Sequence, residues 1–456
     1  MTSRAETMPR RIAGTVLLLG YVVMLAMNAP GQLSYDSVEQ LAEGRAGFYN
    51  SWHPPVMAWL LGFFDRLLPG TLLFLLFQSL LLLAAFLILT WLRPRGWASV
   101  AVSAAIVLSP QWLLFQGEIW KDILFADAAI AGFASLAWYG HNHRSAALVL
   151  AALLLGLAAS TRQNGLVLLP VAAITLWLIL RGKRVSAWRQ GLIFFIALLG
   201  LTTAIQLALV PKTDGGEGTQ AEILLGQSYD LTGALARAPN LGLPLDRHLR
   251  DVLSGPGTRV YSPLRSDPFA ADPVVSQALS QTPDGMIGHA WWWLVQNHPL
   301  LYLQVRKSVF AAVVMTPDPL ICHFSPVGVS APTAMLKPLG LKASIRPQDR
   351  ALANYAKFFF ATPVFSHLAW GGLAVILLAL LLWRGEASDL AVAGLLAGAL
   401  LFSLSFALIS IACDYRYLIF LDLSVMSACL YAVPTHEFLC RLWSRFSRRF
   451  AHPRPD

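Results

Sequence analysis

The stretch Thr71–Leu92 reads TLLFLLFQSLLLLAAFLILTWL and contains no charged residue. A helix needs about 20 mostly apolar residues to cross the roughly 30 Å hydrocarbon core of a bilayer, so this stretch predicts a transmembrane helix. Similar runs recur along the chain, and they predict an all-α polytopic membrane protein with about ten transmembrane helices. The predicted spans are Ile12–Met27, Thr71–Leu92, Trp97–Phe115, Ile123–Tyr139, Ser145–Ser160, Leu166–Leu180, Leu192–Val210, Val364–Trp383, Leu390–Ile411 and Tyr417–Val433.

The composition supports this prediction. The chain is 56% hydrophobic and 13% charged, whereas soluble proteins carry about 25% charged residues. The formal net charge is +9, but the basic residues stand in short clusters between apolar runs. That placement sets the orientation of a membrane protein and is not typical of a nucleic-acid surface. We therefore expect contacts with membrane lipids and none with nucleic acid.

The distribution of Lys and Arg predicts that both termini are cytoplasmic. The short outer connections then hold few basic residues, namely Arg45, Arg66, Lys121, Arg162 and Arg416. Inner segments hold Arg4, Arg10, Arg11, Arg93, Arg95, Arg144, Arg181, Lys183, Arg184, Arg189, Arg384, Arg441, Arg445, Arg448, Arg449 and Arg454. No convincing cleavage pattern follows Ile12–Met27, so we expect this first apolar run to be retained as a helix.

Two outer segments are long. The first, 28–70, includes Pro54–Leu68, which is apolar and too short to span, so we predict a helix on the outer surface. The second, 211–362, is rich in Gly, Pro, Asp and Ser and predicts a periplasmic loop domain. Within it, Leu300–Met315 predicts another interfacial or re-entrant helix, because a span there would place the basic C-terminus outside.

The chain is thereby divided into three parts. Residues 1–210 form an N-terminal transmembrane core with the first outer loop and its interfacial helix. Residues 211–362 form the loop domain, and residues 363–456 form the C-terminal transmembrane helices and a basic cytoplasmic tail.

The four cysteines, Cys322, Cys413, Cys429 and Cys440, form no CxxC pair, so neither a zinc site nor a redox motif is indicated. Cys322 and Cys413 both fall on the outer face in the predicted topology. We expect two unpaired thiols there, with a disulfide as the alternative.

Charged residues at membrane helix ends are functional candidates, and several collect on the outer side. Asp36 lies in the first outer loop, and His53 precedes Pro54 and Pro55, which fix the chain at the start of the surface helix. Asp36 is either a catalytic acid or base or an ordinary helix cap.

The connection Gly-Glu-Ile-Trp-Lys-Asp places Glu118, Lys121 and Asp122 between two apolar helices. Glu118 and Asp122 are four residues apart and would share one face of a helix. In a functional site the acids would orient a sugar or a metal and Lys121 would meet a phosphate. The alternative is a local set of counter-ions.

Two outer arginines stand in motifs. Arg162, followed by Gln163 and Asn164, needs an anionic partner, either a carboxylate or a ligand phosphate. Arg416, in Asp414-Tyr415-Arg416-Tyr417, suits a phosphate together with a sugar or lipid. The alternative for Arg416 is an anchor in the aromatic belt.

His298, Arg306 and Lys307 fall at the second interfacial helix. They would bind a lipid phosphate, or simply contact anionic headgroups. The sequence has no Walker loop, HExxH or Gly-x-Ser-x-Gly motif, so nucleotide-driven transport and serine-hydrolase chemistry are not indicated.

The order of these motifs along the chain, and their common position on the outer side of the membrane, resemble those of the GT-C superfamily of membrane glycosyltransferases. This superfamily includes protein O-mannosyltransferases and the aminoarabinose transferase of lipid A. Asp36 matches the essential acid of the first loop, and His53-Pro54-Pro55 matches the turn before the surface helix. Trp120-Lys121-Asp122 is similar to a stretch in bacterial members, and Asp414-Tyr415-Arg416-Tyr417 resembles the start of a late helix. Ser37 follows Asp36 in place of a second acid, which argues against a protein acceptor.

The resemblance implies inverting transfer of a sugar from a polyprenyl-phosphate donor to a cell-envelope acceptor, in the bacterial inner membrane with the active site facing the periplasm. Asp36 would be the general base, and Arg162, Arg416 and Lys121 would hold the donor phosphate. Sugar or acceptor contacts would come from His53, Glu118, Asp122, Gln163, Asn164, Tyr415 and Tyr417. No cofactor is certain, and a divalent metal at Glu118 and Asp122 is left open.

Two other functions compete. A lipid-linked oligosaccharide flippase or polymerase would place charged residues deep inside its helices, where this chain has only Asp127 and Asp422. In a scaffold or assembly factor, no outer polar residue would be individually essential.

Overall fold

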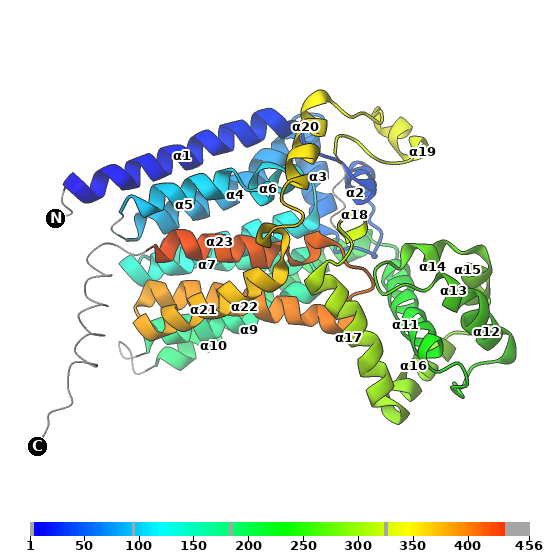
Figure 1. Ribbon diagram of the computed structural model, residues 1–456. Helices are drawn as coiled ribbons and strands as arrows, with labels where there is room; N and C mark the ends of the chain where they lie inside the picture. The colour runs from blue at the N-terminus through cyan, green and yellow to red at the C-terminus, as the bar shows by residue number, and fades with distance from the viewer. Residues whose placement is uncertain (1–3, 94–95, 182–185, 323–326, 434–456) are drawn as a thin grey trace, which may run out of the picture.

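The computed structural model describes residues 4–93, 96–181, 186–322 and 327–433, and they form helices without β-strands (Figure 1). The α-helices are α1 Arg4–Asn28, α2 Tyr35–Ala46, α3 Val56–Leu67, α4 Leu72–Trp91, α5 Ala98–Val107, α6 Pro110–Leu113, α7 Lys121–Asn142, α8 Ser145–Thr161, α9 Leu168–Leu180, α10 Ala187–Leu209, α11 Glu217–Arg237, α12 Arg247–Val252, α13 Thr258–Val260, α14 Asp267–Ala271, α15 Pro273–Ser280, α16 Met286–Asn297, α17 Pro299–Met315, α18 Pro319–Cys322, α19 Thr333–Leu336, α20 Pro347–Lys357, α21 His367–Arg384, α22 Ala387–Ile409 and α23 Ile419–Ala432. Short 3₁₀ turns include η1 Phe115–Gly117, η2 Gln163–Val167 and η7 Tyr415–Leu418.

The chain is an all-α polytopic membrane protein, with fewer full-length spans than expected. Within the described ranges, 7 helices are long and apolar enough to cross a bilayer: α1, α4, α7, η2 with α9, α10, α21 and α22. Helix α5 and the segment of α6 and η1 are bent by 52° relative to each other. If this bent pair forms one span, the number of candidate spans rises to 8. The prediction of about ten also counted α8 and α23, which have 17 and 14 residues and are short for a crossing.

Helix α7 forms the centre of the bundle, and 94% of its apolar window is buried. It packs against α4, α8, α22 and α23. Phe125 in its second turn stacks on Phe402 of α22, with ring centroids 4.4 Å apart, and meets Phe420 of α23 edge-on at 5.1 Å. These large apolar contacts fix the end of α7 where Lys121 and Asp122 lie.

The other elements gather at one end of the bundle, opposite the N-terminus. Figure 1 shows α2, α3 and α11–α16 there, and α18–α20 lie toward the same end. We call it the site end. The segment α11–α17 has its own apolar core, which includes Tyr229, Leu253, Phe269 and Leu294.

Helix α3 is the helix expected from Pro54–Leu68, and it has two apolar sides. Met57 and Leu61 are buried against the protein, whereas Trp59 and Phe63 are exposed and stack on each other at 5.9 Å. Leu300–Met315 likewise forms most of α17, which packs against α11, α21 and α22.

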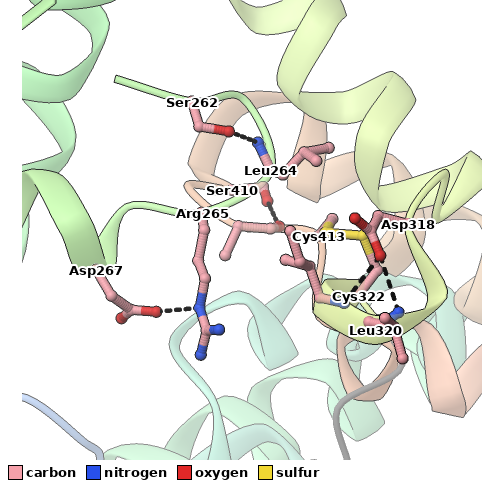
Figure 2. The surroundings of a disulfide bond; sticks show 11 residues. Ser262, Leu264, Arg265, Asp267, Asp318, Leu320, Cys322, Ser410 and Cys413 are labelled. Carbon is pink, nitrogen blue, oxygen red and sulfur yellow. Dashed lines mark hydrogen bonds and ion pairs between the residues drawn. A yellow bond between two sulfur atoms is a disulfide. The ribbon is translucent and has the colours of Figure 1, made fainter. Parts of the chain in front are cut away.

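Cys322 and Cys413 form a disulfide, so the expectation of two unpaired thiols is wrong. The residues are 91 positions apart, and the bond depends on the fold bringing α18 next to the segment before η7. Figure 2 shows the bond beside the loop of Leu264 and Arg265, where the Cys413 amide donates to the Leu264 carbonyl oxygen at 3.0 Å. Cys429 is a free cysteine. Cys440, the basic tail, Arg95, Lys183 and Arg184 lie outside the described residues.

The disulfide should stabilise the site end. Replacing both Cys322 and Cys413 with Ser should lower the free energy of unfolding by about 2–4 kcal/mol, because a long loop is no longer closed in the unfolded chain. Thermal unfolding in detergent measures this, with Cys429→Ser as the control that keeps the bond. Peptide mapping that finds both thiols free in the purified protein would contradict the pairing.

Helices α2 and α3 cross at two glycines. A β-carbon added at Gly44 would run into the backbone of Ala58 and Gly62. Gly44→Val should therefore force the helices apart and lower the free energy of unfolding by about 1–3 kcal/mol. Gly226→Val is the matched control, because nothing lies within 4 Å of a β-carbon there. Equal melting temperatures for the two variants would refute the close crossing.

Candidate functional site at one end of the bundle

Asp36 lies in the first turn of α2, and its carboxylate pairs with Arg416 at 2.8 Å between Oδ2 and Nη1. The helix is capped by Ser34, in a capping box with Ser37. The alternative that Asp36 is the cap is therefore wrong, and its side chain is directed at Arg416. The helix N-terminus also favours a negative charge at this position.

Arg416 is held on two other sides. Its Nε lies 3.4 Å from Oδ2 of Asp414, and its guanidinium lies over the ring of Trp120, 4.8 Å from the centroid. The cation therefore has two carboxylates and one aromatic face around it.

The charges at this site control the ionisation of Asp36. Burial alone would raise its pKa, but the charge of Arg416, the hydrogen bond from Arg416 and the charge of Lys121 oppose it. The result lowers the pKa of Asp36 to about 2, so the group is a carboxylate at neutral pH. At Asp414 burial outweighs Arg416, and the pKa is raised.

Lys121 opens α7, and its Nζ lies 2.6 Å from Nδ1 of His53. Burial, followed by the charge of Lys121, lowers the pKa of His53 to about 3, so the imidazole is neutral and its Nδ1 accepts from the amino group of Lys121. In the described part of the chain, Lys121 forms no ion pair with a carboxylate. Arg416 and Arg162 do have such pairs.

Arg162 follows α8 and pairs with Asp122. Its guanidinium also lies over Phe406 at 5.3 Å and Tyr417 at 5.9 Å. Arg162 thus has a carboxylate partner, one of the two kinds of anionic partner that the sequence predicts for it. The carboxylate of Asp122 is occupied by this ion pair. Within the described residues, no group of three or more His, Cys, Asp or Glu side chains is arranged to hold a metal ion.

The residues after Arg162 reach other elements. Gln163 donates to Glu222 of α11 at 3.1 Å, and Asn164 donates to Ser405 of α22 at 2.9 Å. Glu222 was not predicted from the sequence, because nothing in the pattern around it shows that α11 returns to Arg162. Its carboxylate adds negative charge near Lys121 and Arg162, and burial raises its own pKa.

Several of these side chains line two cavities. One, of about 620 Å³, has Asp36, Trp120, Asp267, Asp414 and Arg416 in its wall. The other, of about 540 Å³, is lined mainly by apolar atoms, with His53, Arg162, Gln163, Leu166 and Val210 among them. Asp36 and Arg416 thus face a polar cavity, while His53 and Arg162 face an apolar one.

The structure does not bring all predicted residues to these cavities. Glu118 and Tyr415 are fully buried, and neither lines one of these two cavities. Arg306 is buried and pairs with Asp230 at 2.9 Å, so it cannot meet a lipid phosphate. His298 and Lys307 are exposed and lie outside both cavities.

The fold and site thus define a polytopic membrane protein with an ionic site at one end of its bundle. No family model and no curated protein matches the chain. Among solved structures it is similar to archaeal oligosaccharyltransferase AglB from Archaeoglobus fulgidus, in complex with an inhibitory peptide and a dolichol-phosphate. The identity is 12% and the TM-score 0.40, over 97% of this chain and 52% of AglB, so the chain spans about half of AglB.

It is also similar to ArnT from Cupriavidus metallidurans, both apo and bound to undecaprenyl phosphate. The identities are 13% and 15%, the TM-scores 0.35 and 0.37, and the matches cover 91% and 94% of this chain and 76% and 78% of ArnT. AglB and ArnT are GT-C glycosyltransferases, the superfamily that the sequence resembles. At these TM-scores, all below 0.5, the likeness does not assign a function to the chain.

The ion pair predicts a pH dependence of stability. Arg416→Gln removes the main charge that lowers the pKa of Asp36, so the variant should be less stable at pH 7. The wild-type pair contributes stability above the ordinary pKa of Asp36, and this is lost as the pH falls toward about 2. Without Arg416, Asp36 has a higher pKa than in the wild type and protonates first as the pH falls. The difference in stability between wild type and variant should therefore narrow below about pH 5.

Melting temperatures in detergent at several pH values test this. Arg265→Gln is the control, since Arg265 and Asp267 form an exposed pair at 2.5 Å that should contribute little. A deficit for Arg416→Gln that stays constant down to about pH 3 would show that Asp36 is not its partner.

Proposed function

We propose that this protein is a membrane glycosyltransferase that moves a sugar from a polyprenyl-phosphate donor to a hydroxyl group of a cell-envelope lipid or glycan acceptor. The observation that carries the proposal is the ion pair of Asp36 and Arg416, which stands in the wall of the polar cavity of about 620 Å³. Lys121 and Arg162 add positive charge close by, and Arg162 faces the apolar cavity. A carboxylate beside clustered cations suits transfer from a phosphate to a hydroxyl.

The donor phosphate binds at the cations. Lys121 is the first anchor, because its amino group contacts His53 and, in the part of the chain that the structure describes, forms no ion pair with a carboxylate. Arg162 and Arg416 complete the anchor, with Asp122 holding Arg162 in place. The apolar cavity takes the start of the isoprenoid tail, which partitions away from water at a membrane surface.

Asp36 acts as the base. The acceptor O–H gives its proton to Asp36, the new bond forms between that oxygen and C1 of the sugar, and the bond from C1 to the phosphate oxygen breaks. Polyprenyl phosphate leaves with the electron pair, and attack opposite to it inverts C1. The phosphate charge offsets the field of Arg416, which makes Asp36 more basic than in the free protein.

The acceptor enters the polar cavity. Its wall combines the indole of Trp120 with three carboxylates and Arg265, groups that suit a polyhydroxyl compound. His53, Gln163, Asn164 and Tyr417 remain candidates for contacts to the sugar. Glu118 and Tyr415 are withdrawn from this role because both are fully buried.

The site faces the periplasm in this proposal, and the protein lies in the inner membrane of a bacterium with both termini cytoplasmic. The basic clusters at the opposite helix ends support this orientation. The pairing of Cys322 and Cys413 at the site end also supports it, because disulfides persist in oxidising compartments.

A flippase is less well supported. It would need charged groups along a route through the bundle, whereas Asp127 and Asp422 are fully buried and bonded to neighbouring side chains.

Transfer of radiolabelled sugar from polyprenyl-phosphate donors to envelope extracts tests the proposal. Asp36→Asn should lower the turnover about 10²–10⁴-fold, the usual contribution of a general base. Because the variant also loses the pair with Arg416, its activity is measured well below its own, lower melting temperature. Glu39→Gln is the matched control, because Glu39 lies one turn along α2 and lines neither cavity. Full activity of Asp36→Asn, or no turnover of any donor by folded wild type, would refute the proposal.

A further inference from the structure

A buried chain of polar side chains lies behind the site. The Tyr415 hydroxyl donates to Asp422 of α23 and accepts from Nε2 of Gln111 of α6 at 2.7 Å. Nδ1 of His367, at the start of α21, lies 3.0 Å from the same Asp422 carboxylate. The His367 ring also stacks on Tyr415, with centroids 4.2 Å apart. Three elements, α6, α21 and α23, therefore meet at this one tyrosine of η7.

The proposed reaction leaves these groups unused. Tyr415, Asp422, Gln111 and His367 are at most 1% exposed, and none of them lines either of the two cavities described above. Ionisable groups inside a membrane bundle are costly to hold and generally mark function. A purely structural contact here could be apolar at lower cost.

The position of Tyr415 next to Arg416 indicates what this chain of buried polar side chains does. Successive residues of a 3₁₀ turn point about 120° apart, so fixing one side chain directs its neighbours. Tyr415 is fixed inward by the polar chain, and Tyr417 is fixed by stacking on Phe406 at 5.2 Å. Arg416 lies between these anchored residues, and its side chain is directed to Asp36 and Trp120.

The segment before η7 is tied in two further ways. Arg306 donates to the carbonyl oxygens of Ala407 at 3.0 Å and Ser410 at 2.8 Å. Cys413 is bonded to Cys322. These ties hold the main chain up to Cys413. Within the turn, Tyr415 packs against the rings of Phe115 and Phe365, and the polar chain fixes the direction of its hydroxyl.

We propose that Tyr415, Asp422 and His367 are positioning residues that hold the Arg416 guanidinium against Asp36 and in place for the donor phosphate. The role in phosphate binding rests on the proposed function, but the placement of Arg416 does not. The same assignment accounts for Asp422, the charged residue within α23, without a route across the membrane.

The placement of Arg416 can be tested without any substrate. Phenylglyoxal modifies accessible arginines, and mass spectrometry of the full-length protein in detergent gives the rate at Arg416. Tyr415→Phe removes only the hydroxyl, and the rate at Arg416 should rise about tenfold, the factor equivalent to one buried hydrogen bond. Asp422→Asn, which keeps the shape of the side chain, should give the same rise if Tyr415→Phe folds poorly.

Tyr431→Phe is the matched control. Tyr431 is another fully buried tyrosine that donates to a buried aspartate, Asp389, at 2.9 Å, and it lies at the other end of α23. It should leave the rate at Arg416 unchanged. An unchanged rate in Tyr415→Phe and Asp422→Asn, or an equal rise in the control, would overturn the proposal.

A double-mutant cycle in the transfer assay tests the link to function. Tyr415→Phe should lower kcat/KM about tenfold in the wild type and have little further effect in Arg416→Lys, because both act through one cation. Equal losses in both backgrounds would show that Tyr415 does not act through Arg416. If folded wild type shows no transfer while the phenylglyoxal result holds, the proposed function fails and the positioning role stands.

Discussion

The ion pair between Asp36 and Arg416 joins residues 380 positions apart, and the site depends on it. Neither charge is stable alone in a partly dehydrated place, because an unpaired buried charge costs several kcal/mol. The pair therefore requires α2 and η7 to meet at one end of the bundle. That meeting also brings Trp120, at the start of α7, under the guanidinium, so the first, central and last parts of the chain are fixed together.

Much of this arrangement could be predicted from the sequence, because a membrane imposes simple rules. Apolar runs must be helical, since no water satisfies the backbone inside a bilayer. Successive connections must alternate in side, so the outer motifs fall at one end whatever the packing of the helices. These rules predict Asp36, Lys121 and Arg416 at one end of the bundle, and in the structure they lie close together. The same rules predict too many full-length spans, because short helices such as α8 can pack beside long ones.

The remaining contacts could not be predicted, because they depend on side-chain direction and distant packing. Tyr415 and Arg416 are adjacent in one motif, yet one points into the bundle and the other into the cavity. Glu222 approaches Gln163 only because α11 folds back over the site. The bond between Cys322 and Cys413 depends in the same way on where α18 comes to lie, and spacing along the chain contains no information about it.

Two buried aspartates, Asp422 and Asp127, support the segments that carry the cations of the site. Asp422 holds η7 through Tyr415, and Asp127 of α7 accepts from Gln116 at 2.9 Å, next to the turn that leads to Lys121. Each carboxylate lies behind a segment that carries a cation of the site. Cations stabilise a leaving phosphate most when they are already in place and need no reorganisation as charge develops. A flexible outer loop would lose that advantage, so the carboxylates inside the membrane support the rigidity of the charges at its surface.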